Sequence, residues 1–177
     1  MKFSKLYLLF FMVAGLVACS SSDDGNVALA TFVASSRAPG PSQVFLASEM
    51  EEGQTITVSV KVRDLARVAA SDLVLEYSAA RLVFFARLPG SFLEQGPVPV
   101  SYEVFEEIPG RLRARIARST GGTASTGPGE ETLVFFRFQV VATGDTAIAF
   151  TSDSVMLDEQ PAALGGVTFF GGTFVGT

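Results

Sequence analysis

The sequence contains no histidine and no tryptophan, and it has a single cysteine. Without histidine, the usual Ser–His and Cys–His nucleophile pairs and all His-ligated metal sites are excluded. One cysteine can form neither an internal disulfide nor a thiolate zinc cluster. Most common catalytic and metal-binding arrangements are therefore excluded, and we predict a protein that is not an enzyme and needs no cofactor.

Basic residues are also few, because 13 Lys and Arg stand against 18 Asp and Glu, for a formal net charge of −5. Nucleic-acid binding requires a basic surface for the phosphates, so this charge argues against a nucleic-acid partner. Apolar residues, in contrast, make up 48% of the 177 residues, including 16 Phe. That is enough for one domain with a substantial core.

The N-terminus begins with the basic segment Met1–Lys5, followed by the short apolar run Leu6–Val17. A basic start and about 7–15 apolar residues are typical of a secretory signal peptide. The run is too short to span a bilayer, which takes about 20 residues. We predict that residues 1–18 are a signal peptide that is removed.

The only cysteine, Cys19, follows Leu16-Val17-Ala18 and precedes the polar segment 20–26. This arrangement resembles the lipobox of bacterial lipoproteins. The resemblance implies that Cys19 is acylated, for example with palmitate, and that residues 19–26 tether a domain at 27–177 to a membrane. It implies a lipid-anchored protein of the cell envelope, on the outer membrane if the cell has one, because serine follows the cysteine. The alternative is an ordinary thiol beside a conventional cleavage site.

The rest of the sequence alternates apolar and polar residues with period two, which predicts β-strands rather than helices. The clearest case is Gln54–Arg63, where Ile56, Val58, Val60 and Val62 share one side. Turn signals such as Pro89-Gly90 and Pro109-Gly110 separate the strands. Further strands are expected at 27–34, 43–48, 72–77, 82–87, 98–106, 111–118, 133–141, 146–151 and 167–175. With no amphipathic helix to cover a sheet, we predict an all-β, jelly-roll-like sandwich of two sheets and about nine strands.

Five segments in this order resemble the cohesin family, a β-sandwich module whose best-known members receive dockerins. They are Glu52–Val58, Ala70–Phe84, Pro89–Leu93, Thr132–Phe138 and Gly171–Val175. The sequence departs from the family at Ser78-Ala79, where Asp-Pro is frequent and shapes only a turn. The resemblance implies a cohesin-like fold over 43–175 and a protein partner, dockerin-like or other. Related sandwich modules bind polysaccharides, so the fold leaves the ligand open.

The resemblance also implies that one exposed sheet binds the partner, formed by the strands at 72–77, 98–106, 111–118 and 133–141. Alternation then predicts the residues that face outward: Val74, Glu76, Glu103, Arg111, Arg113, Arg115, Phe135 and Arg137, with Phe105 beside them. Arginine and aromatic side chains together are typical of interaction hot spots. The alternative is that the arginines pair across strands with Glu76, Glu103 and Glu106. A register slip of one residue would turn Phe135 inward.

Two other ligand classes stay open. A carbohydrate-binding module would hold polysaccharide on aromatic platforms, for which the domain offers Tyr102, since the phase of Tyr77 places it in the core. Acidic clusters at Glu49–Glu52, Glu106-Glu107, Glu130-Glu131 and Asp158-Glu159 could supply oxygen ligands for calcium. None has the spacing of an EF-hand loop, so calcium is left open and no metal site is predicted.

Overall fold

The computed structural model describes residues 29–37, 40, 42–119, 122–126 and 129–177. Within these ranges the chain forms twelve β-strands and no helix, and accordingly no helix there could span a membrane. The predicted all-β class is confirmed. The predicted signal peptide, the tether and Cys19 lie outside the described residues, as do the first two residues of the strand expected at 27–34.

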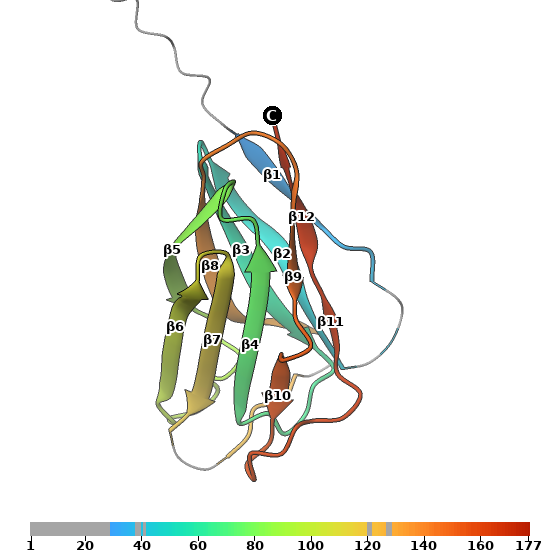
Figure 1. Cartoon of the computed structure of the whole chain (residues 1–177). Helices are drawn as coiled ribbons and strands as arrows, with labels where there is room; N and C mark the ends of the chain where they lie inside the picture. Colours follow the sequence, from blue (N-terminus) through green and yellow to red (C-terminus); the bar gives the residue numbers. More distant parts are fainter. Residues whose placement is uncertain (1–28, 38–39, 41, 120–121, 127–128) are drawn as a thin grey trace, which may run out of the picture.

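The strands form two sheets that pack face to face (Figure 1). The seven-stranded sheet has the order β1 (Ala30–Ala34), β12 (Gly172–Gly176), β9 (Thr146–Phe150), β4 (Ala70–Tyr77), β7 (Arg111–Arg118) and β6 (Val100–Ile108), and β10 (Val155–Leu157) also pairs with β4. The five-stranded sheet has the order β11 (Thr168–Phe170), β2 (Gln43–Glu52), β3 (Thr55–Arg63), β8 (Glu130–Val140) and β5 (Leu82–Pro89). All pairings are antiparallel except that of β11 with β2.

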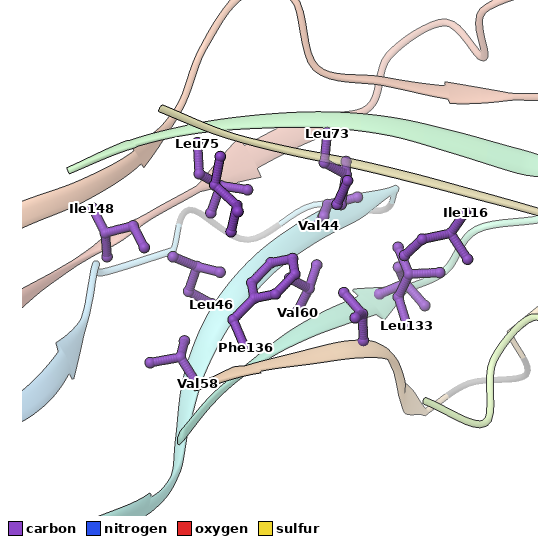
Figure 2. Close-up of a cluster of buried hydrophobic side chains, with 14 of the residues drawn as sticks. Val44, Leu46, Val58, Val60, Leu73, Leu75, Ile116, Leu133, Phe136 and Ile148 are labelled. Atoms are coloured by element: carbon purple, nitrogen blue, oxygen red, sulfur yellow. The ribbon is translucent and has the colours of Figure 1, made fainter. Parts of the chain in front are cut away.

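The core lies between the sheets, where the alternating apolar residues of both meet. Ile56, Val58, Val60 and Val62 of β3 are fully buried, as predicted. Figure 2 shows Phe136 of β8 between side chains of the two sheets, with Leu46 and Val60 close to its ring. Alternation thus placed the inner side of these strands correctly, because the apolar side chains of each strand gather on the side that packs against the other sheet.

An aromatic cluster connects the sheets at one end of the core. The ring of Phe138 in β8 lies 5.1 Å from that of Tyr77 in β4 and 5.7 Å from that of Phe174 in β12. Phe84 of β5 adds a third edge-on contact at 5.9 Å. Such edge-to-face pairs stabilise by about 0.5–1.5 kcal/mol beyond their burial.

The structure corrects the sheet assignment of one predicted strand. Residues 133–141 were expected beside β4, β6 and β7, but β8 pairs with β3 and β5 in the opposite sheet. The prediction that the four strands form one exposed sheet was therefore wrong. Alternation shows which side chains of a strand face the core. It does not show in which sheet the strand lies, because the strands of both sheets alternate in the same way.

Two smaller differences concern the C-terminal strands and the first strand. The strand expected at 167–175 is split into β11 and β12, which belong to different sheets, and β10 was not predicted. β1 pairs with β12 at the edge of the seven-stranded sheet, in register from Ala30–Gly176 to Ala34–Gly172. Its described residues are thus part of the sandwich rather than of the tether.

Candidate functional site

The outer side of the seven-stranded sheet carries the three predicted arginines. Arg111, Arg113 and Arg115 alternate along β7 with the buried Leu112, Ala114 and Ile116. Five carboxylates surround them, from Asp72 and Glu76 of β4, Glu103 and Glu107 of β6, and Asp153 of the turn after β9. We call this surface the arginine face.

All three guanidinium groups on the arginine face form ion pairs with their neighbours. Arg113 donates to both carboxylate oxygens of Asp72, at 2.8 and 2.9 Å, and to Glu107 at 2.7 Å. Arg111 donates to Glu76 at 2.7 Å, Glu107 at 2.9 Å and Asp153 at 2.8 Å. The pairs of Arg115 with Asp72 and Glu103 are longer, at 3.6 Å each. The hydrogen bonds from Arg113 and Arg111 lower the pKa of the Glu107 carboxyl, which links two arginines.

One predicted partner of the arginines was wrong. Alternation along β6 gives Glu107 the outward phase of Glu103, whereas Glu106 shares the inward phase of Val104 and stands opposite the buried Leu112. Glu106 accepts a hydrogen bond from the Tyr77 hydroxyl and one from the Gly110 amide at 3.3 Å. The pKa of Tyr77 is raised mainly by burial and secondly by this hydrogen bond to Glu106. The core placement predicted for Tyr77 is confirmed.

Val74 points toward the arginine face but is fully buried, so the expectation that it is available to a partner was wrong. The segment between β9 and β10 lies against β4 at this position. The Thr151 amide donates to the Val74 carbonyl at 2.8 Å, and the Ser154 hydroxyl bonds both the Val74 amide and its carbonyl. Two exposed apolar residues on β6 are available instead, Phe105 and Ile108, and the Arg115 guanidinium lies 6.0 Å from the Phe105 ring centre.

Phe135 and Arg137 lie on the outer side of the five-stranded sheet, away from the other six predicted residues. Phe135 does point outward, because Val134 and Phe136 beside it are both buried. The two residues line a cavity of about 410 Å³ together with Glu49, Met50, Glu52, Thr57 and Leu88. We call this surface the cavity face. The sequence had singled out Glu49–Glu52 only as an acidic cluster, and Thr57 and Leu88 were missed, since the lining residues come together only through the pairing of β2, β3, β8 and β5.

Tyr102 does not offer an exposed platform for a sugar ring. Its side chain packs against the core from β6, and its hydroxyl donates to the Gly90 carbonyl at 3.1 Å. Burial, with the nearby Glu94 carboxylate, raises the pKa of Tyr102 to about 12. The Arg87 guanidinium covers the ring at 5.1 Å from its centre.

Three of the four predicted acidic clusters contain a carboxylate in an ion pair, among them Glu107 of the arginine face. Glu49 bonds Lys61 at 2.9 Å and accepts from the Ser59 hydroxyl at 2.7 Å. Glu130 pairs with Arg37 at 3.0 Å and with Arg63. In the part of the chain that the structure describes, no three acidic side chains gather as metal ligands.

Comparisons with known proteins find similarity at the level of structure. No protein-family model matches the sequence, and no curated protein does. The sixth cohesin of scaffoldin B from Acetivibrio cellulolyticus, solved in complex with a Cel5 dockerin, is 15% identical, with a TM-score of 0.55 over 75% of this chain and 92% of that one. The cohesin CaCohA2 from Clostridium acetobutylicum is 18% identical, with a TM-score of 0.58 over 75% and 90%.

A third similar structure comes from an archaeon. The non-cellulosomal cohesin of Archaeoglobus fulgidus is 21% identical, with a TM-score of 0.52 over 81% of this chain and 88% of that one. Identities this low show the fold rather than the ligand. The two packed sheets, their strand order and these three structures together lead to one conclusion: the chain has a cohesin-like fold.

Proposed function

We propose that this protein is a non-catalytic interaction module of the cell envelope, which binds a protein partner through the arginine face. The observation that carries this proposal is the ion-pair network of Arg111, Arg113 and Arg115. The network holds long, charged side chains in fixed positions around the exposed ring of Phe105. A surface that is ordered before binding loses less conformational entropy when a partner docks.

The charge of the arginine face favours a partner with basic groups. Five carboxylates stand against three arginines, so the face keeps an excess of negative charge after internal pairing. Glu103 is the most exposed of these carboxylates, with 64% of its side chain accessible, and its only ion pair is long. Lysine or arginine on a partner would pair with Glu103 and steer the encounter. The solved cohesin–dockerin complex supports a protein rather than another ligand class.

We further propose that Cys19 carries the lipid anchor and that residues 19–26 connect it to the domain at 27–177. The described chain begins beside its own C-terminus, where the Leu29 amide donates to the Thr177 carbonyl at 3.3 Å (Figure 1). An anchor there would place one end of the sandwich toward the membrane and leave the sides of both sheets accessible. Incorporation of labelled palmitate in cells, and its loss in Cys19→Ala, would check the anchor.

The partner-binding proposal is tested by capture from an envelope extract of the source organism. The immobilised protein should retain a specific protein, and the double variant Glu103→Lys with Phe105→Ala should lose it. The matched control is Gln139→Lys with Val83→Ala, a cross-strand pair on the outer side of the five-stranded sheet that does not line the cavity, and it should retain the same protein. Retention by the first variant would contradict the assigned face. Retention of polysaccharide alone, displaced by free sugar, would replace the proposal with the carbohydrate-binding alternative.

A further inference from the structure

The cavity face holds a depression with an apolar interior and charged ends. Met50 of β2, Phe135 of β8 and Leu88 of β5 supply the apolar lining. Met50 and Leu88 are 52% and 48% exposed, and with Phe135 they form one apolar patch, which is more informative than single exposed side chains. The volume of about 410 Å³ is in the range of ligand-binding sites.

The strand pairing explains why a depression forms at this place. Thr57 of β3 pairs with Met50 on one side and with Arg137 on the other. Thr57 is short and nearly buried, so it forms the floor, while the longer side chains of β2 and β8 stand on either side. The walls are two strand spacings apart, about 10 Å. The depression is therefore a channel along β3, open toward solvent, with room for an extended segment.

The charges of the cavity face are arranged differently from those of the arginine face. Glu49 is already neutralised by Lys61, at 2.9 Å. Arg137 lies over the ring of Phe85, 5.2 Å from its centre. Among the residues that the structure describes, no carboxylate lies within ion-pair distance of Arg137. A guanidinium group held on a ring beside an apolar cavity offers its donors to a ligand carboxylate.

We propose that this cavity is a second binding site, for an extended segment of a partner polypeptide in which a carboxylate and a large apolar side chain stand two residues apart and so point to the same side. The apolar side chain occupies the space between Met50, Leu88 and Phe135, and the carboxylate pairs with Arg137. Glu52, on the opposite wall, repels an acidic group and so fixes the direction of the segment. The open channel favours a polypeptide over a free acid, because a site for a small ligand normally encloses most of its surface. The proposal is independent of the function assigned to the arginine face.

The test uses a capped pentapeptide with glutamate at its centre, a serine on each side of it and a leucine at each end, titrated into isotopically labelled protein. Backbone amide shifts should map to Thr57, Phe135 and Arg137. Replacing the peptide glutamate by glutamine should weaken binding by about fivefold, the value of one exposed ion pair. Arg137→Gln should lower the affinity for the glutamate peptide by the same factor and leave the affinity for the glutamine peptide unchanged.

Two matched variants on β5 show whether binding depends on the apolar contact in the cavity or on any loss of an exposed apolar side chain from that strand. Leu88→Ser should weaken the binding of both peptides. Val83→Ser should weaken neither, because Val83 is similarly exposed on β5, at 41% against 48%, but does not line the cavity. Urea unfolding midpoints close to wild type confirm that all variants are folded. Equal affinity for both peptides, shifts confined to another surface, or no shifts at 10 mM peptide, roughly the weakest affinity such a short segment can show, would each overturn the proposal.

Discussion

The two outer sheet faces of the sandwich use arginine in opposite ways. On the arginine face, Arg111, Arg113 and Arg115 are all bound by carboxylates of the same face. On the cavity face, Arg137 rests on the Phe85 ring beside exposed apolar side chains. One face thus presents an ordered network of ion pairs. The other presents an open apolar channel beside the Arg137 guanidinium, which forms no ion pair with the residues that the structure describes.

The difference shows that a residue type does not determine its role in a β-sandwich. Arg113 and Arg137 both alternate with buried residues, and both point to solvent from a central strand. Their roles differ because of what pairs across from them: Asp72 lies diagonally from Arg113 on β4, while Thr57 stands directly opposite Arg137 on β3. Cross-strand neighbours therefore decide between pairing and availability.

The largest effect is expected in the core, on which both faces depend. Phe138→Ala removes a fully buried ring that contacts Tyr77, Phe84 and Phe174. The free energy of unfolding should fall by about 3–5 kcal/mol, the usual cost of truncating a buried phenylalanine. Urea unfolding measures this loss, with Phe105→Ala as a control that should change stability by less than about 0.5 kcal/mol. A small loss in Phe138→Ala would contradict the role of the aromatic cluster in connecting the sheets.

Much of this fold could be predicted from sequence, because alternation is a direct consequence of burying one side of each strand. For example, alternation correctly predicted which residues of β3, β4, β7 and β8 face the core. The resemblance to cohesins then predicted that the strands form a two-sheet sandwich. The sheet to which β8 belongs could not be predicted, since both sheets impose the same alternation. β10 was too short, at three residues, to show any period.

The second largest effect on stability is expected when an arginine of one face is replaced and compared with the same replacement on the other face. Arg113→Met leaves Asp72 without its bidentate partner and Glu107 with Arg111 alone. The free energy of unfolding should fall by about 1 kcal/mol, at the upper end for partly exposed ion pairs. Arg137→Met should change it by less than about 0.5 kcal/mol, because only a cation–π contact is lost. Equal losses in urea unfolding would remove the distinction between the faces.

The residues of the arginine face could be predicted only in part. Glu76 and Glu103 were expected from their phase, and Asp72 shares the phase of Glu76, so the same rule could have found it. Glu107 has the phase of Glu103 and could have been found in the same way. Asp153 could not be predicted, because it lies in the turn after β9, outside any alternating strand. The cavity combines residues from four strands, and no local pattern connects them.

A smaller effect should appear when salt is added. Raising sodium chloride from 50 mM to 500 mM shortens the screening length and weakens exposed ion pairs. The stability difference between wild type and Arg113→Met should therefore shrink, by about half a kcal/mol. The difference between wild type and Arg137→Met should stay the same. A difference that does not depend on salt would mean that Arg113 stabilises through packing rather than through charge.

The smallest effect is a change in the titration of single carboxyl groups. Hydrogen bonds from Arg113 and then Arg111 lower the pKa of Glu107 on the arginine face. On the cavity face, burial acts to raise the pKa of Glu49, but the bonds from Ser59 and Lys61 outweigh it and lower the pKa. A carboxyl whose pKa is lower in the folded state binds fewer protons than in the unfolded state. Its contribution to stability is complete above the unfolded pKa and is lost as the pH falls through the folded pKa.

Arg113→Met should therefore raise the pKa of Glu107 toward its ordinary value and leave the pKa of Glu49 unchanged. The side-chain carboxyl carbons, followed by NMR between pH 2 and pH 7, report both groups in one sample, around the ordinary glutamate pKa of about 4.3. The acid-induced loss of stability should also become smaller in the variant, because the pKa of Glu107 in the folded state then lies closer to its unfolded value, with only the bond from Arg111 left to lower it. If both pKa values moved together, the two faces would be electrostatically coupled through the sandwich. The difference between Arg113, which is paired within its own face, and Arg137, which is available to a ligand, could then not be explained from the neighbours on each face alone.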